Sequence, residues 1–192
     1  MFLIDRNTEL GSLSPAVPSW WGSGPITLRA RALHLGRAPT RLIYAEQITL
    51  YERALALDPD SEKAQCYLAM QLASRVLDQM TDSAASDLAR AETLANRALA
   101  AFPRTARAHR ARAQVLRAQK RFEEAIPEYE TVLALNRNWV EAIAVLGYCK
   151  FITGSIEEAI PAQERASPQP PRSGDLAILL LDWASASAAI TH

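Results

Sequence analysis

The side chains that could carry out catalysis or bind a metal are few in this sequence, and they are scattered. His34, His109 and His192 share no sequence context with carboxylates or thiols that would indicate a zinc or catalytic site. Cys66 and Cys149 each lack a second cysteine or a histidine at metal-ligand spacing, so we expect small buried apolar groups rather than reactive thiols. We therefore predict no catalytic, metal-binding or cofactor-binding residues, and a chain that is not an enzyme.

Motifs for nucleotide binding and hydrolysis are also missing from the sequence. It contains no G-x-x-x-x-G-K-[ST] loop, no strand-borne G-x-G-x-x-G and no G-x-S-x-G elbow. Two pairs of adjacent glutamates have the residue type for acid–base catalysis, but both belong to the pentapeptide Glu-Glu-Ala-Ile-Pro, which occurs at 123–127 and again at 157–161. Repetition favours a structural role in the first turn of a helix, where negative charge complements the helix dipole. The glutamates are Glu123, Glu124, Glu157 and Glu158.

Composition and charge exclude several classes of protein. The chain has 192 residues, of which 49% are hydrophobic and 22% charged, with 21 basic and 21 acidic side chains. Such a chain can bury a sizeable core, and without net charge it has no general electrostatic attraction to nucleic acid or to an anionic membrane. The apolar start at 1–4 is too short for a signal peptide, and the run at 176–181 is too short to span a bilayer. We expect a cytoplasmic protein with no nucleic-acid or membrane partner.

The elements that position the side chains are predicted to be helices. From Leu28 to Arg165 the sequence is rich in Ala, Leu, Arg, Glu and Gln, which are good helix formers. The two copies of Glu-Glu-Ala-Ile-Pro set a period of 34 residues. Leu-Asp-Pro at 57–59 and Ala-Phe-Pro at 101–103 are helix ends of one kind. They lie further apart than one period of 34 residues, and an enlarged turn in the polar stretch at 78–87 explains the additional residues. Pro127 and Pro161 lie a few residues inside their helices, where we expect a slight bend rather than a break.

A helix–turn–helix period of 34 residues resembles the tetratricopeptide repeat (TPR) family. The resemblance rests on small and large residues at matching places, such as Ala113, Ala125, Tyr129 and Leu146-Gly147. It implies an all-α fold, a short right-handed superhelix of antiparallel helix pairs with about four repeats. We expect an irregular leader at 1–27, a TPR domain at 28–165 with repeats near 28–61, 62–105, 106–139 and 140–166, and an atypical tail at 166–192.

Charge is segregated along the predicted repeats. Residues 104–121 contain seven basic side chains and no acidic one, whereas residues 122–165 are rich in glutamate. In the TPR family the first helix of each repeat lines a concave groove that holds extended peptides, and family spacing maps ten groove positions here. These are Lys63, Cys66, Met70, Arg107, Arg110, Gln114, Arg117, Glu141, Tyr148 and Phe151.

This basic and aromatic groove suits an acidic or C-terminal peptide segment, because arginine pairs with carboxylates in bidentate geometry. The alternative is a solvated helix face that is balanced by the glutamate-rich helix behind it. Met70 and Gln114 stand where chaperone-binding members of the family carry asparagine, so chaperone binding is not expected.

A finer resemblance suggests a second function. Stretches such as YERALALDPDSEKA and the segment from Arg117 to Glu164 resemble the C-terminal TPR region of rhizobial adenylate cyclases and winged-helix regulators. The expected function is a non-catalytic scaffold that binds a protein or peptide partner. The alternatives are a truncated TPR tail of such a signalling protein, inactive as an enzyme by itself, and an element that self-associates through exposed repeat ends.

The segment from Ala166 onward does not continue the repeat pattern. Where an Ala-Leu pair and a closing Asp-Pro are expected, the chain reads ASPQPPRSGDLAILLLDW. Permitted codons for this segment, read one nucleotide later, encode a Ser-Pro-Arg-Asp-Pro helix end and an aromatic-rich helix, which resembles full-length relatives. We therefore expect 166–192 to be an out-of-frame continuation rather than an evolved domain end, and the gene sequence tests this.

Overall fold

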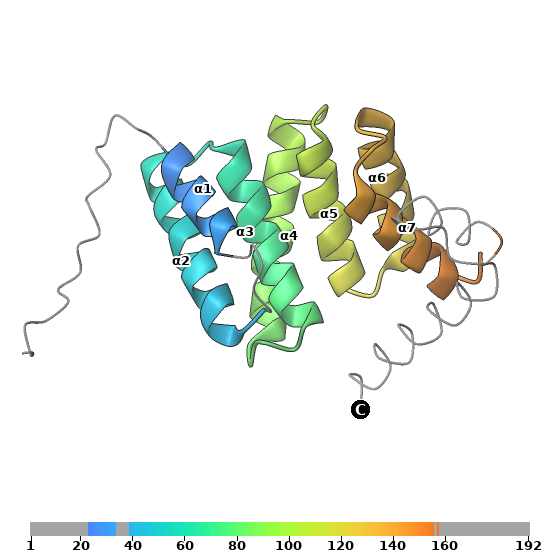
Figure 1. Ribbon diagram of the computed structural model, residues 1–192, viewed down its shortest axis with the longest axis horizontal. Helices are drawn as coiled ribbons and strands as arrows, with labels where there is room; N and C mark the ends of the chain where they lie inside the picture. Colours follow the sequence, from blue (N-terminus) through green and yellow to red (C-terminus); the bar gives the residue numbers. More distant parts are fainter. Residues whose placement is uncertain (1–22, 34–38, 156, 158–192) are drawn as a thin grey trace, which may run out of the picture.

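The computed structural model describes residues 23–33, 39–155 and 157, and this part of the chain contains seven α-helices and no strand. Figure 1 shows the helices side by side in a row. The predicted all-α fold is confirmed. The helices are α1 (Gly24–Ala32), α2 (Arg41–Leu57), α3 (Glu62–Leu77), α4 (Ala84–Ala101), α5 (Ala106–Ala118), α6 (Phe122–Leu135) and α7 (Val140–Ile152).

The helices form antiparallel pairs that stack into a short right-handed superhelix. α1 packs on α2, α3 on α4 and α5 on α6, and neighbouring pairs touch through α2–α3, α3–α5, α4–α5 and α6–α7. The helices α3, α5 and α7 begin at Glu62, Ala106 and Val140, which are the first residues of the second, third and fourth expected repeats. The partner expected for α7, with Ala159 and Pro161, and the expected tail at 166–192 lie outside the described residues.

The first helix starts earlier than its sequence indicates. We expected an irregular leader at 1–27 and helical repeats from Leu28 onward, but α1 begins at Gly24 with Pro25 in its first turn. A proline fits there because the first-turn N–H groups have no partner within the helix. The preceding Ser23 is buried and its hydroxyl lies 2.9 Å from that of Ser61, so the α2–α3 turn holds the start of α1. The rest of the expected leader, 1–22, is outside the described residues.

The turns that follow α3, α5 and α7 each contain one residue in the left-handed backbone region. Gln79, Lys120 and Gly154 have φ values of 53°, 62° and 86° and follow α3, α5 and α7 respectively. The next residue donates its N–H back into the last helical turn in all three cases, for example Arg121 to Leu116 O at 2.9 Å. The enlarged turn expected at 78–87 is shorter, because α4 already begins at Ala84.

Helix α6 supports two expectations about the repeated pentapeptide. Glu123 and Glu124 lie in its first turn, and the helix continues through Pro127 without a break. Arg121 donates to both carboxylate oxygens of Glu124 at 2.6 Å, which adds a local ion pair to the interaction with the helix dipole. The equivalent Pro161 is outside the described residues.

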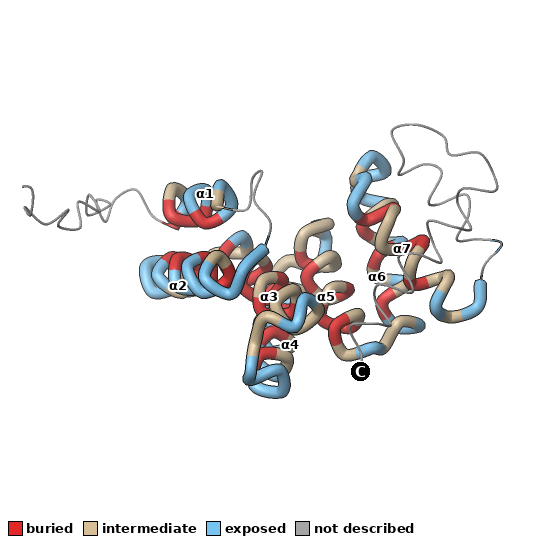
Figure 2. The backbone as a smooth tube through the Cα atoms, turned by 60° about the horizontal axis from the view of Figure 1, so that its bottom comes forward, coloured by how far each residue is buried: buried red, intermediate tan, exposed pale blue. Residues whose placement is uncertain are grey.

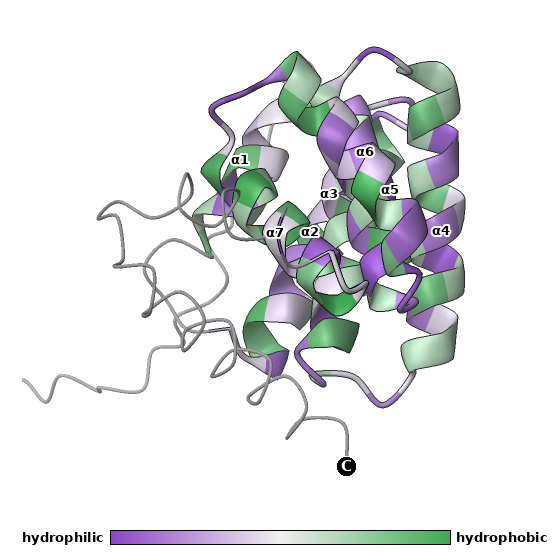
Figure 3. Ribbon diagram, turned by 90° about the vertical axis from the view of Figure 1, so that its right-hand side faces the viewer, coloured by the Kyte–Doolittle hydropathy of each residue, from purple (hydrophilic) through white to green (hydrophobic). Residues whose placement is uncertain are grey.

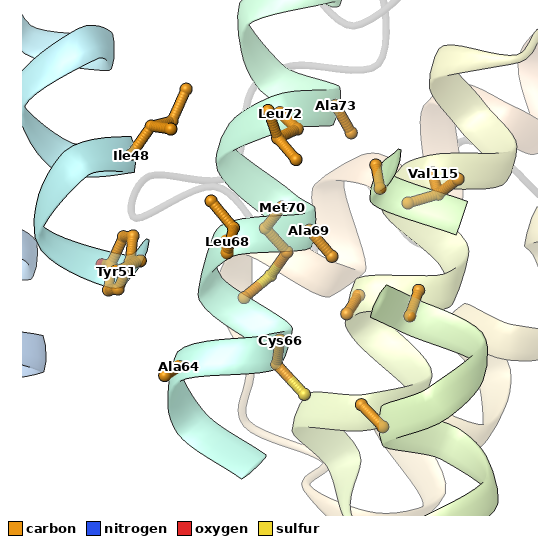
Figure 4. Close-up of a cluster of buried hydrophobic side chains, with 14 of the residues drawn as sticks. Ile48, Tyr51, Ala64, Cys66, Leu68, Ala69, Met70, Leu72, Ala73 and Val115 are labelled. Atoms are coloured by element: carbon orange, nitrogen blue, oxygen red, sulfur yellow. The ribbon is translucent and has the colours of Figure 1, made fainter. Parts of the chain in front are cut away.

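The core consists of two clusters that meet at α5. The first joins α1 to α5 and contains Tyr51, Leu68 and Leu72, whereas the second joins α5, α6 and α7 and contains Leu116, Tyr129 and Leu146. Figure 4 shows part of the first cluster, and Figure 2 shows that buried residues follow the helix sides that face other helices. Small residues allow this close approach, since Ala69, Ala113 and Ala125 are fully buried.

Hydrophilic and hydrophobic residues occur together along the helices, as Figure 3 shows. Within residues 23–33, 39–155 and 157, no helix combines the length and the apolarity needed to cross a membrane.

Candidate functional site

Four polar side chains lie along one side of α5, and we call them the arginine face. They are Arg107, Arg110, Gln114 and Arg117, at helical spacings of i, i+3, i+7 and i+10. All four are partly buried, whereas Ala108, Ala111, Val115 and Ala118 of the same helix are buried in the first core cluster. α5 therefore presents its charged side away from the first cluster and toward side chains of α3 and α7.

Arg107 is held by residues of α3. One guanidinium nitrogen lies 3.0 Å from Glu62 Oε1, and the guanidinium carbon lies 5.6 Å from the ring centre of Tyr67. Arg31 of α1 approaches the same ring at 5.1 Å, and Tyr51 stacks on it with ring centres 5.7 Å apart. Tyr67 is thus the centre of an aromatic and cationic cluster that joins α1, α2, α3 and α5.

Arg110 is held by residues at the start of α7. Its guanidinium forms an ion pair with Glu141 and lies over the ring of Trp139, 5.0 Å from the ring centre. The side chain of Arg110 is 17% exposed, so this pair is screened less than a fully exposed one. The contact connects the third and fourth repeats through their first helices.

Gln114 uses both ends of its amide within the protein. Its nitrogen donates to Ser74 Oγ of α3 at 3.0 Å, and its oxygen accepts from the Tyr129 hydroxyl of α6 at 3.1 Å. Gln114 therefore links α5 to α3 and to α6 through hydrogen bonds. The amide keeps a second N–H and a second oxygen lone pair that these two hydrogen bonds do not use.

Arg117 differs from the other two arginines of the face. No carboxylate of the described residues forms an ion pair with it, whereas Arg107 and Arg110 each have one. Its Nε is buried without a hydrogen-bond partner, as is the Nε of Arg107. Burial is the main cause that raises the pKa of Tyr129 and of Tyr44, and the positive charge of Arg117 opposes the rise in both. The charge of Arg117 therefore interacts with the hydroxyl groups of Tyr44 on α2 and Tyr129 on α6.

The remaining expected groove residues are placed less uniformly. Lys63 is exposed, and Tyr148 and Phe151 are partly buried, with Tyr148 packed edge-on against Phe122 at 5.9 Å between ring centres. Met70 differs from its expected groove position, whereas the burial of Cys66 agrees with the expectation of a small buried apolar group. Met70 is 5% exposed and Cys66 is fully buried, because both belong to the apolar stripe of α3 that packs in the first core cluster.

Sequence reasoning missed the side chains that contact the arginine face. Glu62, Tyr67 and Ser74 on α3, and Trp139 before α7, are its direct partners. The sequence could have identified two of these residues as neighbours on one face, since Tyr67 and Ser74 lie seven residues apart on one side of α3.

The groups that could carry out other chemistry are occupied or buried. His109 Nδ1 lies 2.7 Å from Glu128 Oε2, and its Nε2 lies 3.0 Å from the Pro103 carbonyl oxygen. Both cysteines are free and buried. In the part of the chain that the structure describes, no three His, Cys, Asp or Glu side chains gather as a metal site would require.

Comparisons with known proteins agree with this architecture. A family model described as tetratricopeptide repeat matches residues 82–142, from the turn before α4 to the start of α7. A comparison with curated proteins finds no match.

Several solved structures are similar to the chain. MamA from Desulfovibrio magneticus RS-1 is 17% identical, with 75% of this chain and 73% of that chain covered and a TM-score of 0.54. The first TPR domain of human RPAP3 is 23% identical, with coverage of 71% and 95% and a TM-score of 0.54. YrrB, described as a TPR protein with an unusual peptide-binding site, is 20% identical, with coverage of 85% and 78% and a TM-score of 0.52. At these identities the likeness is one of fold.

Proposed function

We propose that this chain is a non-catalytic scaffold that binds a peptide segment of another protein along the arginine face. The observation that carries the proposal is the arrangement of α5, whose Arg107, Arg110 and Arg117 line one side of a helical repeat between α3 and α7. An extended peptide that crosses the first helices would meet guanidinium groups and aromatic rings in succession. Carboxylate side chains on the peptide are the complementary chemistry.

Two further features support a binding role. Tyr67 and Trp139 place aromatic rings beside the arginines, and such rings provide rigid contact area at low entropic cost. The match of a tetratricopeptide repeat model to residues 82–142 adds a family context in which protein partners are common. The alternative of a solvated helix face predicts that these arginines bind no peptide.

A second proposal is that the chain is a truncated TPR tail of a signalling protein. The resemblance of the repeat segments to rhizobial adenylate cyclases and winged-helix regulators supports it. In that case the same face would bind a segment of a cyclase or regulatory domain encoded next to the repeats. Sequencing of the flanking DNA tests it, and an adjacent open reading frame for such a domain is the expected result.

Selection of peptides from a phage-displayed random library tests the main proposal. We expect the selected peptides to be enriched in Asp and Glu, and we expect the triple change Arg107→Ala, Arg110→Ala and Arg117→Ala to weaken their binding and flatten its salt dependence. The matched control changes Arg53, Arg104 and Arg137 to alanine, which removes the same charge from exposed positions outside the face. Equal affinity of the two triple variants, or no enriched peptide at all, would leave the solvated-face interpretation in place.

A further inference from the structure

The three arginines of the face are not equivalent, because two of them already have carboxylate partners within the chain. Glu62 lies 3.0 Å from Arg107, and Glu141 pairs with Arg110. Each pair joins two successive first helices, α3 to α5 and α5 to α7. A carboxylate from a bound peptide would have to displace Glu62 or Glu141 before it could pair with either arginine.

Arg117 has no such partner among the described residues. The residue is partly buried, and its buried Nε–H donates to no acceptor. The Nε–H of Arg107 also lacks an acceptor, but the Glu62 carboxylate balances the charge of that guanidinium, so Arg117 alone of the three lacks both. A buried donor or charge without a partner costs free energy, since it has lost water and gained nothing in exchange. Its place in the last turn of α5 gives it a favourable interaction with the helix dipole, but that interaction does not satisfy the Nε–H.

The polar groups around Arg117 belong to four helices. Its charge acts on Tyr44 of α2, Tyr129 of α6 and Cys149 of α7, and Gln114 lies one turn before it on α5. The carboxylate nearest to Tyr44, Asp78, accepts the Tyr44 hydroxyl at 2.5 Å and forms no ion pair within the described residues. The charge of Arg117 thus acts on two phenols and a thiol, and no carboxylate of the described residues forms an ion pair with it.

We propose that Arg117 is the anion-binding centre of the arginine face, which receives one carboxylate of a bound peptide, while Glu62 and Glu141 act as internal competitors that keep Arg107 and Arg110 occupied. This inference rests on the proposed peptide-binding function and makes it more specific. A partner then needs one acidic side chain at the level of Arg117, and further acidic residues contribute little to affinity. Removal of Glu62 or Glu141 makes a second carboxylate useful.

A titration with acetate tests the anion site without any peptide. In ¹⁵N-labelled protein at constant ionic strength, we expect the Nε–H resonance of Arg117 to shift on addition of acetate in exchange for chloride, while those of Arg107 and Arg110 stay in place. In Glu62→Gln and Glu141→Gln variants, the resonances of Arg107 and Arg110 respectively should begin to respond. Equal shifts of all three arginines in the unaltered chain, or none at Arg117, would overturn the inference. A stronger response of Arg117 to inorganic phosphate than to acetate would also overturn it, in favour of a phosphate-bearing partner.

A mutant cycle with a selected peptide then locates the contact. The peptide is used with its Asp residues intact or changed singly to Asn, against Arg117→Gln and against the control Arg53→Gln on the exposed side of α2. We expect Arg117→Gln to weaken binding by about tenfold to a hundredfold, and one Asp→Asn change to have no additional effect in that variant. Glu62→Gln and Glu141→Gln should tighten binding of peptides with two acidic residues by up to about fivefold.

The two hypotheses fail in different ways. If acetate shifts Arg117 but no peptide is selected, the anion site stands and the peptide-binding function is wrong. If acidic peptides bind but Arg117→Gln weakens them no more than Arg107→Gln and Arg110→Gln do, the function stands and the special role of Arg117 is wrong. Thermal unfolding of each variant, followed by circular dichroism, shows whether a loss of binding reflects a loss of fold.

Discussion

Burial sets the reactivity of the two cysteine thiols. Cys66 and Cys149 are fully buried, and burial raises the pKa of Cys66 to about 12 and that of Cys149 to about 11. Because the thiolate is the nucleophile, a raised pKa means that less of each thiol is reactive at neutral pH than in an ordinary cysteine. We expect both to react slowly with a disulfide reagent such as DTNB in the native protein, and rapidly once urea unfolds the chain.

The same experiment separates burial from pKa. Raising the pH from neutral toward 9 should accelerate the reaction of the unfolded chain strongly, since ordinary thiols ionise in that range. The native protein should react far more slowly throughout the same interval, and its rate should keep rising without levelling off, because the pKa values of its thiols lie above this range. Fast labelling of either cysteine in the native state would contradict the buried positions of α3 and α7.

At the level of single residues, the sequence predicts charge better than orientation. The run of arginines on α5 was visible in the sequence, and the structure places Arg107, Arg110 and Arg117 on one side of that helix. Met70 was assigned to the groove by family spacing, yet Cys66, Met70 and Ala73 form one apolar stripe of α3 and pack in the core. The pairing of Arg107 with Glu62 and of Arg110 with Glu141 depends on how neighbouring helices are aligned, which no local pattern encodes.

At the level of elements, the turn after α5 stores backbone strain. Lys120 has a φ of 62°, a region that residues with a Cβ atom rarely adopt, whereas the equivalent position after α7 is Gly154. We expect Lys120→Gly to stabilise the protein by up to about 1 kcal/mol, since relief of strain outweighs the added freedom of the unfolded chain. Urea unfolding measures the change.

A lysine inside a helix provides the control for this turn. Lys63 is exposed in the first turn of α3. A glycine there relieves no backbone strain and has a lower helix propensity than lysine. Lys63→Gly should therefore destabilise the protein, by about 1 kcal/mol or less. If both changes were destabilising, the left-handed conformation of Lys120 would not be a source of strain.

The helices themselves were largely predictable because their boundaries repeat. The residues that close α2 and α4 precede Pro59 and Pro103, and the starts of α3 and α5 follow at the same distance from those prolines. The boundary at Gly24 was not predictable from local sequence, since Gly-Ser-Gly-Pro is typical of a linker. It depends on tertiary contacts, as Ser23 reaches the α2–α3 turn and Ile26 and Ala30 are buried beside α2.

At the level of the whole molecule, stability depends on how strongly the two core clusters are coupled, so that a defect in one destabilises the other. In a repeat protein each unit contacts only its neighbours, so a local defect weakens adjacent helices more than distant ones. Here α5 is the shared element, with Ala111 and Val115 in the first cluster and Ala113 and Leu116 in the second. Alternate positions on one helix therefore serve two separate cores.

Two matched truncations test this division. Leu72 and Leu116 are 1% and 2% exposed and belong to the first and second cluster respectively, so each change to alanine should cost about 2 to 5 kcal/mol. Native-state hydrogen exchange should distinguish them, because local opening follows the stability of each region. We expect Leu72→Ala to accelerate exchange mainly in α2, α3 and α4, and Leu116→Ala to accelerate it mainly in α6 and α7, with α5 affected by both. Uniform acceleration across all helices in both variants would show instead that the described residues unfold as one cooperative unit and that the two clusters are not energetically separate.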